Sequence, residues 1–89
     1  MLREVSGIAY IDGDRFACIQ DEEGTIFIYN RATNEIEKEI PFAGPGDYEG
    51  ITLADNTAYV VRADGRLYEV PMAEGKKGVK EWETSLTVE

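Results

Sequence analysis

The chain repeats itself with a period of about 42 residues, and this feature constrains its fold more than any other. Three pairs of matching segments define the repeat: GI at 7–8 and 50–51, FACI at 16–19 and AYVV at 58–61, and the glycines Gly24 and Gly65. The offset between matching segments falls from 43 to 42 and then to 41 residues. Because loops tolerate changes of length better than strands do, the loss of one residue in each of two turns explains this drift. We therefore divide the chain into a first blade repeat, residues 1–46, and a second, residues 47–89.

Each repeat has the pattern of four short β-strands. The predicted strands cover 7–11, 15–20, 25–29 and 35–42 in the first repeat, and 50–54, 57–62, 66–70 and about 79–84 in the second. Turns such as Asp12-Gly13 and Asp55-Asn56 separate runs of β-branched and aromatic residues. Asp-Gly and other turns that end in glycine are the strongest short-range signal of a β-hairpin when they stand between such runs. No segment has helical periodicity, so the sequence predicts an all-β chain.

The last strand of each repeat differs from the other three. The first three strands are apolar on both faces, as in IFIY at 26–29, which suits strands that are covered on both sides. The last strand is charged, EIEKEI at 35–40 and KEWE at 80–83, which is typical of an edge strand protected against unwanted pairing. This arrangement, repeated at this period, is typical of β-propeller blades. The predicted fold is two four-stranded antiparallel β-propeller blades.

Composition excludes several classes of function. The chain carries 18 acidic residues against 9 basic ones, a formal net charge of −9, so neither nucleic acid nor an anionic membrane is an expected partner. The negative charge favours metal cations, basic partners or simple solubility. The single cysteine, Cys18, excludes an internal disulfide, and the lack of histidine excludes Ser–His and Cys–His pairs. No apolar run has transmembrane length, and the opening MLREVSG is not a signal peptide.

Two short motifs open the two repeats. REVSGIAYI at 3–11 and GDYEGITL at 46–53 resemble the repeat openings of the SdiA-regulated family of bacterial β-propellers, which is related to the esterase-like phytase propellers. The resemblance covers about residues 2–70 and implies a six-bladed propeller in the bacterial periplasm or at the cell surface, with bound calcium in some members. This chain has two blades where the family has about six, and it has no leader peptide. We therefore expect an excised or designed piece of such a propeller.

Two blades cannot cover their own faces. A blade buries its faces against neighbouring blades, so two blades alone leave two apolar faces in water. Propellers close at roughly 4–8 blades, which corresponds to two, three or four copies of this chain. The resemblance favours six blades, so the expected partner is the chain itself, as a homotrimer with head-to-tail contacts.

The stretch GDYEGI places two carboxylates, Asp47 and Glu49, at the start of the innermost strand of the second blade. Strands in a blade alternate in direction, so the loops at 4–6, 21–23, 46–49 and 63–65 are expected at the same end of the ring. Carboxylates that gather there suit a hard cation such as calcium, with Asp47 and Glu49 as ligands and Glu4 and Asp21 as weaker candidates. The alternative is that Asp47 caps a turn and Glu49 is solvated, since no Asp-x-Asp-x-Asp-Gly loop is present.

The remaining reactive residues are interpreted as structural. Cys18 lies in the middle of an apolar strand and is expected to be buried and inert. Arg62 is expected to form a local ion pair with Asp64. The function that the sequence predicts is therefore a non-enzymatic propeller unit that assembles into a ring and requires no cofactor, with a cation or small ligand at the central channel. The alternative, implied by the resemblance, is a calcium-dependent phosphoesterase.

Overall fold

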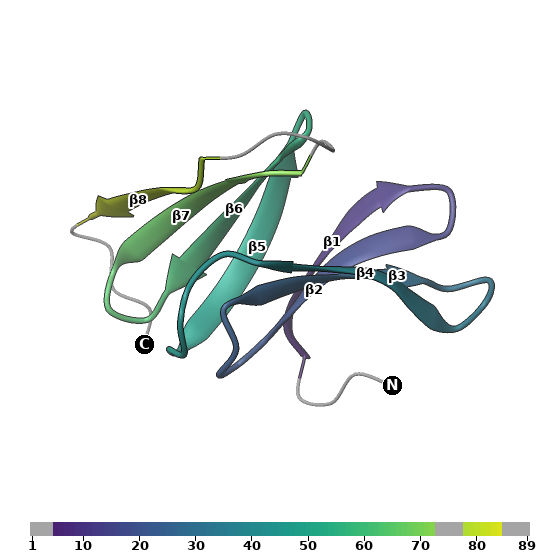
Figure 1. Ribbon diagram of the computed structural model, residues 1–89, viewed down its shortest axis with the longest axis horizontal. Helices are drawn as coiled ribbons and strands as arrows, with labels where there is room; N and C mark the ends of the chain where they lie inside the picture. The colour runs from purple at the N-terminus through teal and green to yellow at the C-terminus, as the bar shows by residue number, and fades with distance from the viewer. Residues whose placement is uncertain (1–4, 73–77, 85–89) are drawn as a thin grey trace.

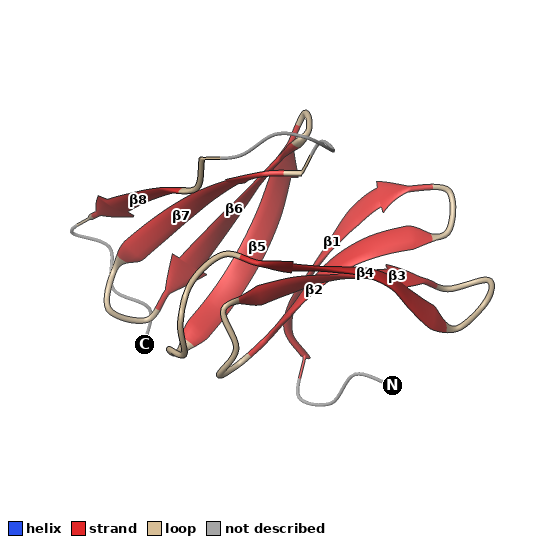
Figure 2. Cartoon of the chain, viewed as in Figure 1, coloured by secondary structure: helices blue, strands red, loops and turns tan. Residues whose placement is uncertain are grey.

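The structure is a computed structural model that describes residues 5–72 and 78–84. It contains eight strands: β1 (Val5–Asp12), β2 (Arg15–Gln20), β3 (Thr25–Asn30), β4 (Glu35–Pro41), β5 (Tyr48–Ala54), β6 (Thr57–Arg62), β7 (Arg66–Pro71) and β8 (Lys80–Glu83). They form two antiparallel sheets of four strands each, in the orders β1-β2-β3-β4 and β5-β6-β7-β8 (Figures 1 and 2). The predicted all-β fold with two four-stranded sheets is confirmed. Across the described residues, no helix of a length and apolarity suited to crossing a membrane is present.

Two irregularities in register explain the motifs that open the two repeats. In β1, Val5 pairs with Gln20 and Gly7 pairs with Ile19, so Ser6 is an extra residue that bulges from the ladder. In β5 the register shifts in the same way between Tyr48 and Gly50. Both strands therefore begin earlier than the sequence predicted, because the residues before each glycine already pair across the bulge. A bulge bends a strand and redirects its side chains.

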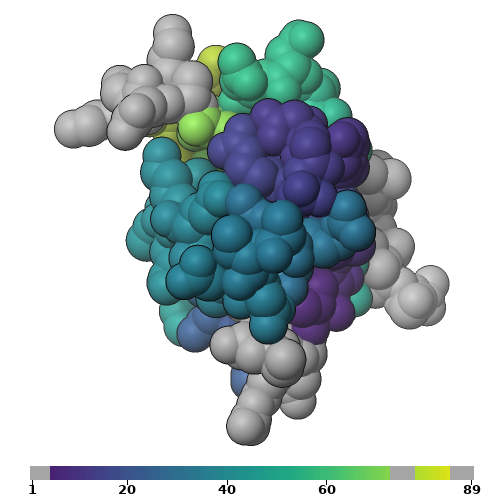
Figure 3. Space-filling view, turned by 90° about the vertical axis from the view of Figure 1, so that its right-hand side faces the viewer, coloured from purple at the N-terminus to yellow at the C-terminus, as the bar shows by residue number. Residues whose placement is uncertain are grey.

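The turns follow the predicted hairpins. Gly13 has a φ of 46° in the β1–β2 turn, and Asp55 has a φ of 55° in the β5–β6 turn, the left-handed conformation that glycine and Asp tolerate best. The β1–β2 turn lies beside the β3–β4 turn, where the Arg31 backbone N–H donates to Asp14 O at 2.7 Å (Figure 3). The Asp12-Gly13-Asp14 segment is thus a hairpin turn, as the sequence predicts.

The hydrophobic core lies between the two sheets. The buried residues that form it are Ala17, Ile19, Ile26, Ile28, Tyr48, Ala58, Val60, Tyr68 and Val70. The backbones of the sheets approach each other where β5 meets β1 and β2, and β4 and β8 are the outer strands of their sheets (Figure 1). Four-stranded antiparallel sheets that pack on one another are the units of a β-propeller.

The joint between the sheets is close because of one glycine. A Cβ placed on Gly7 would lie 3.2 Å from Gly50 Cα and 3.2 Å from the side chains of Ile19 and Ile51. Beside it, the Ser6 hydroxyl donates to Tyr48 O at 2.8 Å. The bulge in β1 thus places a small residue and a hydrogen-bond donor against the neighbouring sheet.

The connection between the sheets is held against the β2–β3 turn. The Phe42 and Ala43 backbone N–H groups donate to Gly24 O at 2.8 and 3.2 Å. Gly24 is buried, and a Cβ there would lie 2.2 Å from Ala43 O. The Phe42 ring packs edge-on against Tyr48, with ring centroids 5.3 Å apart. The proposed division between residues 46 and 47 falls in this connection, after β4 and before β5.

Candidate functional site

The loops that carry the acidic residues lie at the same end of the molecule. The Tyr48 backbone N–H donates to Asp21 O at 2.9 Å, and the Gly46 N–H donates to Glu22 O at 3.1 Å. The Ala63 N–H donates to Asp47 O at 2.8 Å. The β2–β3 turn, the β4–β5 connection and the β6–β7 turn are therefore tied together through their backbones, as strand alternation predicts.

Within GDYEGI, the central aromatic has the structural role. Tyr48 is fully buried, and its hydroxyl donates to Gly44 O. Burial raises the pKa of this hydroxyl above its usual value. Asp47 and Glu49 on either side are exposed, and neither forms an ion pair with any residue that the structure describes.

The candidate cation ligands do not form a compact cluster within the single chain. Over residues 5–72 and 78–84, no three acidic or cysteine side chains gather closely enough to hold a metal ion. Glu4 lies outside the described residues. The calcium site at Asp47, Glu49, Glu4 and Asp21 thus stays a prediction.

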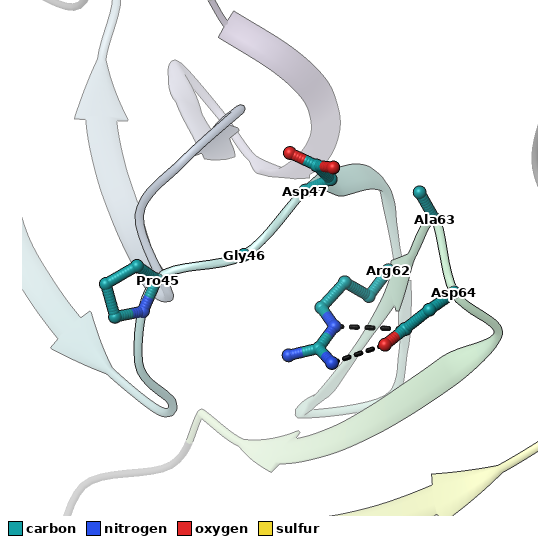
Figure 4. Close-up of a pocket in the computed structure, with 6 residues that line it drawn as sticks. All are labelled: Pro45, Gly46, Asp47, Arg62, Ala63 and Asp64. Carbon is teal, nitrogen blue, oxygen red and sulfur yellow. Dashed lines mark hydrogen bonds and ion pairs between the residues drawn. The ribbon is translucent and has the colours of Figure 1, made fainter.

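An open pocket lies beside the acidic loops. It has a volume of about 510 Å³ and is lined by Pro45, Gly46, Asp47, Arg62, Ala63 and Asp64 (Figure 4). Arg62 Nε donates to Asp64 Oδ1 at 3.0 Å, and a second guanidinium N–H donates to the other carboxylate oxygen, so the predicted local ion pair is present. This hydrogen bonding lowers the pKa of Asp64 to about 2. The Asp47 carboxylate points away from the guanidinium in Figure 4, so the pocket holds one paired and one unpaired carboxylate.

Two potential nucleophiles among the described residues, Cys18 and Ser6, have structural environments. Cys18 is buried, as predicted, and burial raises the pKa of its thiol, which keeps it protonated. The Ser6 hydroxyl donates to a backbone carbonyl and has no base beside it among the described residues. Neither group is activated for attack.

The back face of the first sheet, which we define by Ile8, Tyr10, Cys18 and Phe27, points away from the second sheet. Ile8 pairs with Cys18, and Cys18 pairs with Phe27, so these side chains share one face. Cys18 and Phe27 are buried, whereas Ile8 is 59% exposed and Tyr10 is 60% exposed. The innermost strand of this face is therefore open to solvent.

The front face of the second sheet, which we define by Tyr59, Val61, Leu67 and Trp82, points away from the first sheet. Val61 pairs with Leu67, and Leu67 pairs with Trp82. Trp82 is 50% exposed, and the other three are half-buried. The sequence predicted that the aromatic residues pack between blades. The structure places Tyr48 and Tyr68 between its two sheets, and it leaves Tyr10 and Trp82 on the open faces.

Comparison with protein-family models and with curated proteins gives no match. Among solved structures, the fold is similar to that of Sqt1 from Saccharomyces cerevisiae, a WD40 β-propeller protein, with a TM-score of 0.62 at 13% identity. The match covers 84% of this chain and 20% of the Sqt1 chain, so this chain spans about a fifth of that neighbour. At this identity the likeness shows a β-propeller-like fold. The link to the SdiA-regulated family rests on the two motifs and stays a resemblance.

Proposed function

We propose that this chain is a non-enzymatic β-propeller unit that binds further copies of itself through its open sheet faces and closes a ring of blades. Ile8 and Tyr10 carry this proposal, because both are large apolar residues exposed on the innermost strand β1. Their counterparts in the second repeat, Ile51 and Leu53, pack against the core. Full burial of an isoleucine side chain contributes roughly 1.5–3 kcal/mol, and covering Ile8 in an assembly supplies the part of this that its 59% exposure leaves open.

The number of copies follows from blade counting. Rings of roughly 4–8 blades are the known closed forms, so chains of two blades close as two, three or four copies. The resemblance to six-bladed propellers favours three. The proposed assembly is a cyclic homotrimer in which every copy makes the same two contacts.

The molar mass in solution tests this proposal. Multi-angle light scattering at micromolar concentration is expected to give three times the 9.9 kDa mass of the chain. Ile8→Glu is expected to reduce the mass to that of one chain, because it places a charge in the contact. Thr33→Glu adds the same charge in an exposed turn and should leave the mass unchanged. A well-folded wild-type monomer throughout this range would show that the open faces are not assembly surfaces.

A second candidate function is cation binding on the ring axis. The observation that favours it is the pair of exposed carboxylates, Asp47 and Glu49, at the start of the innermost strand β5. Oxygen ligands of this kind suit calcium, and a ring would bring equivalent carboxylates toward one axis. The phosphoesterase activity that the resemblance implies would require this ion. Phosphate release from a phosphate ester, measured with and without calcium, therefore distinguishes this activity from cation binding alone: release that needs calcium indicates the enzyme, and no release with either sample indicates binding alone.

A further inference from the structure

We propose that the open front face of the second sheet docks on the open back face of the first sheet of the next copy, and that this contact repeats the joint already present inside the chain. The inference rests on the proposed function and deepens it, because it names the two faces, their direction and the residues at their closest approach. It makes the contact head-to-tail, since the two faces differ.

The first argument comes from the front faces. Inside the chain, the first sheet presents Ala17, Ile19 and Ile26 to the second sheet, and all three are 0% exposed. The repeat places Tyr59, Val61 and Leu67 at these same positions in the second sheet. These residues are apolar or aromatic like their counterparts, but they are half-buried, because no further sheet lies in front of them in the single chain.

The second argument comes from the back faces. Inside the chain, the second sheet presents Tyr48, Ile51 and Leu53 toward the first sheet, and all of them pack in or against the core. The repeat places three residues at these positions in the first sheet: Val5, Ile8 and Tyr10. All of these are exposed, at 44%, 59% and 60%. Each open face is thus the counterpart of one half of the joint inside the chain.

The third argument comes from the glycines at the closest approach. Gly7 allows β1 to lie against β5, where an added Cβ would meet atoms at 3.2 Å. Gly50 is its counterpart in the bulge of β5, yet an added Cβ there would meet only Val61 Cγ1, at 3.6 Å. Packing inside the single chain therefore does not explain why residue 50 is a glycine. In the proposed contact, Gly50 takes the place of Gly7 and lies against β1 of the next copy.

One difference between the repeats makes the contact between copies weaker than the joint inside the chain. The Ser6 hydroxyl donates to Tyr48 O at 2.8 Å. The counterpart of Ser6 is Glu49, whose carboxylate accepts hydrogen bonds and cannot donate one to a carbonyl. Glu49→Ser restores the donor, and we expect it to tighten the association between copies by about tenfold, the effect of one added hydrogen bond.

Blocking one face at a time tests the direction of the contact. Gly50→Val blocks the front face of the second sheet, and inside the chain an added Cβ at Gly50 makes only an ordinary van der Waals contact, with Val61 Cγ1 at 3.6 Å. Ile8→Glu blocks the back face at an exposed position. Gly44→Val, at a site with no atom within 4 Å, is the control for adding a side chain, and Thr33→Glu is the control for adding a charge. Circular dichroism and thermal melts establish that each variant folds.

Native mass spectrometry distinguishes the outcomes. Each blocked variant alone is expected to give the mass of one chain, and a mixture of the two is expected to give a complex that contains one copy of each. Both controls should assemble as the wild type does. A dimer of either blocked variant alone would overturn the head-to-tail direction, because it requires a face that pairs with itself. Assembly of Gly50→Val like the wild type would overturn the role of Gly50. A wild-type monomer would instead contradict the proposed function itself.

Discussion

At the scale of single residues, two glycines are required by close approach rather than by backbone conformation. Gly7 lies against β5, and Gly24 lies beneath the connection between the sheets, where its carbonyl accepts two backbone hydrogen bonds. The acidic residues are the conspicuous ones in GDYEGI, but Tyr48 is the residue of this stretch that packs in the core, where it is fully buried between the sheets.

Gly24→Ala is expected to destabilise the chain severely. A Cβ at this position would lie 2.2 Å from Ala43 O, which is backbone and cannot move aside like a flexible side chain. Overpacking typically costs about 1–3 kcal/mol and occasionally more, and a clash with backbone atoms places Gly24→Ala at the upper end of this range. Chemical denaturation followed by tryptophan fluorescence measures the loss. Gly44→Ala, at an open site, is expected to change stability by less than about 0.5 kcal/mol, and equal effects of the two variants would contradict the packing at Gly24.

Asp64 is expected to make stability depend on pH in the acid range. Its pKa falls from the ordinary value of 3.8 to about 2, chiefly because Arg62 donates hydrogen bonds to its carboxylate. A carboxyl with a lowered folded-state pKa contributes stability above its unfolded pKa and loses it as the pH falls through the folded pKa. The stability deficit of Asp64→Asn should therefore be constant above about pH 5 and shrink progressively until it is nearly gone at about pH 1. Denaturation midpoints of both proteins at matched pH give the difference, and a deficit that is as large at about pH 2 as at about pH 5 would contradict this ion pair.

At the scale of elements, the two bulges and the two charged outer strands organise each sheet. The bulges at Ser6 and Glu49 explain why a small or polar residue stands before the glycine in both motifs. The strands β4 and β8 lie at the outer edges of their sheets, and their residues are largely exposed. An exposed edge presents unpaired backbone groups that can pair with another chain, so its charges have a protective role.

Removing charge from β4 is expected to cause aggregation. The double variant Lys38→Thr with Glu39→Val raises the β-propensity of an exposed edge and removes two of its charges. Static light scattering over days at 37 °C is expected to rise faster than for the wild type. Lys38→Arg with Glu39→Asp keeps both charges and serves as the control. If both double variants stay as clear as the wild type, the charges of β4 do not protect this edge.

At the scale of the whole molecule, the negative charge of the chain is expected to oppose the proposed assembly of copies. Each copy brings a formal net charge of −9, and loops with acidic residues are tied together at one end. Like charges near a common axis repel, and added salt screens that repulsion. Apolar contact and charge thus act in opposite directions, and assembly should be stronger at higher ionic strength.

A divalent cation is expected to stabilise the ring more than screening does. Millimolar calcium should raise the melting temperature beyond the value reached in sodium chloride of equal ionic strength, because binding to the folded assembly favours it. Asp47→Asn with Glu49→Gln should remove this extra increment and leave the fold intact. Differential scanning fluorimetry in both salts makes the measurement. If calcium and matched sodium chloride have equal effects on the melting temperature, the two carboxylates bind no cation and are solvated residues at the start of β5.

The sequence by itself determined the strands, their order and the two four-stranded sheets. Strand ladders and hairpin turns depend on side-chain alternation and on turn residues such as Gly13, and both are local properties of the chain. The ion pair of Arg62 with Asp64, which lies two residues away, followed for the same reason.

Only the tertiary structure decided which face of each strand is covered. Ile8 and Ile51 are the same residue at the same position of the two repeats, after equivalent bulges. Ile51 packs against the core and Ile8 is 59% exposed, because one sheet has a neighbour behind it and the other does not. Burial depends on which surfaces meet in space, and a repeated local pattern specifies the surfaces without specifying their neighbours.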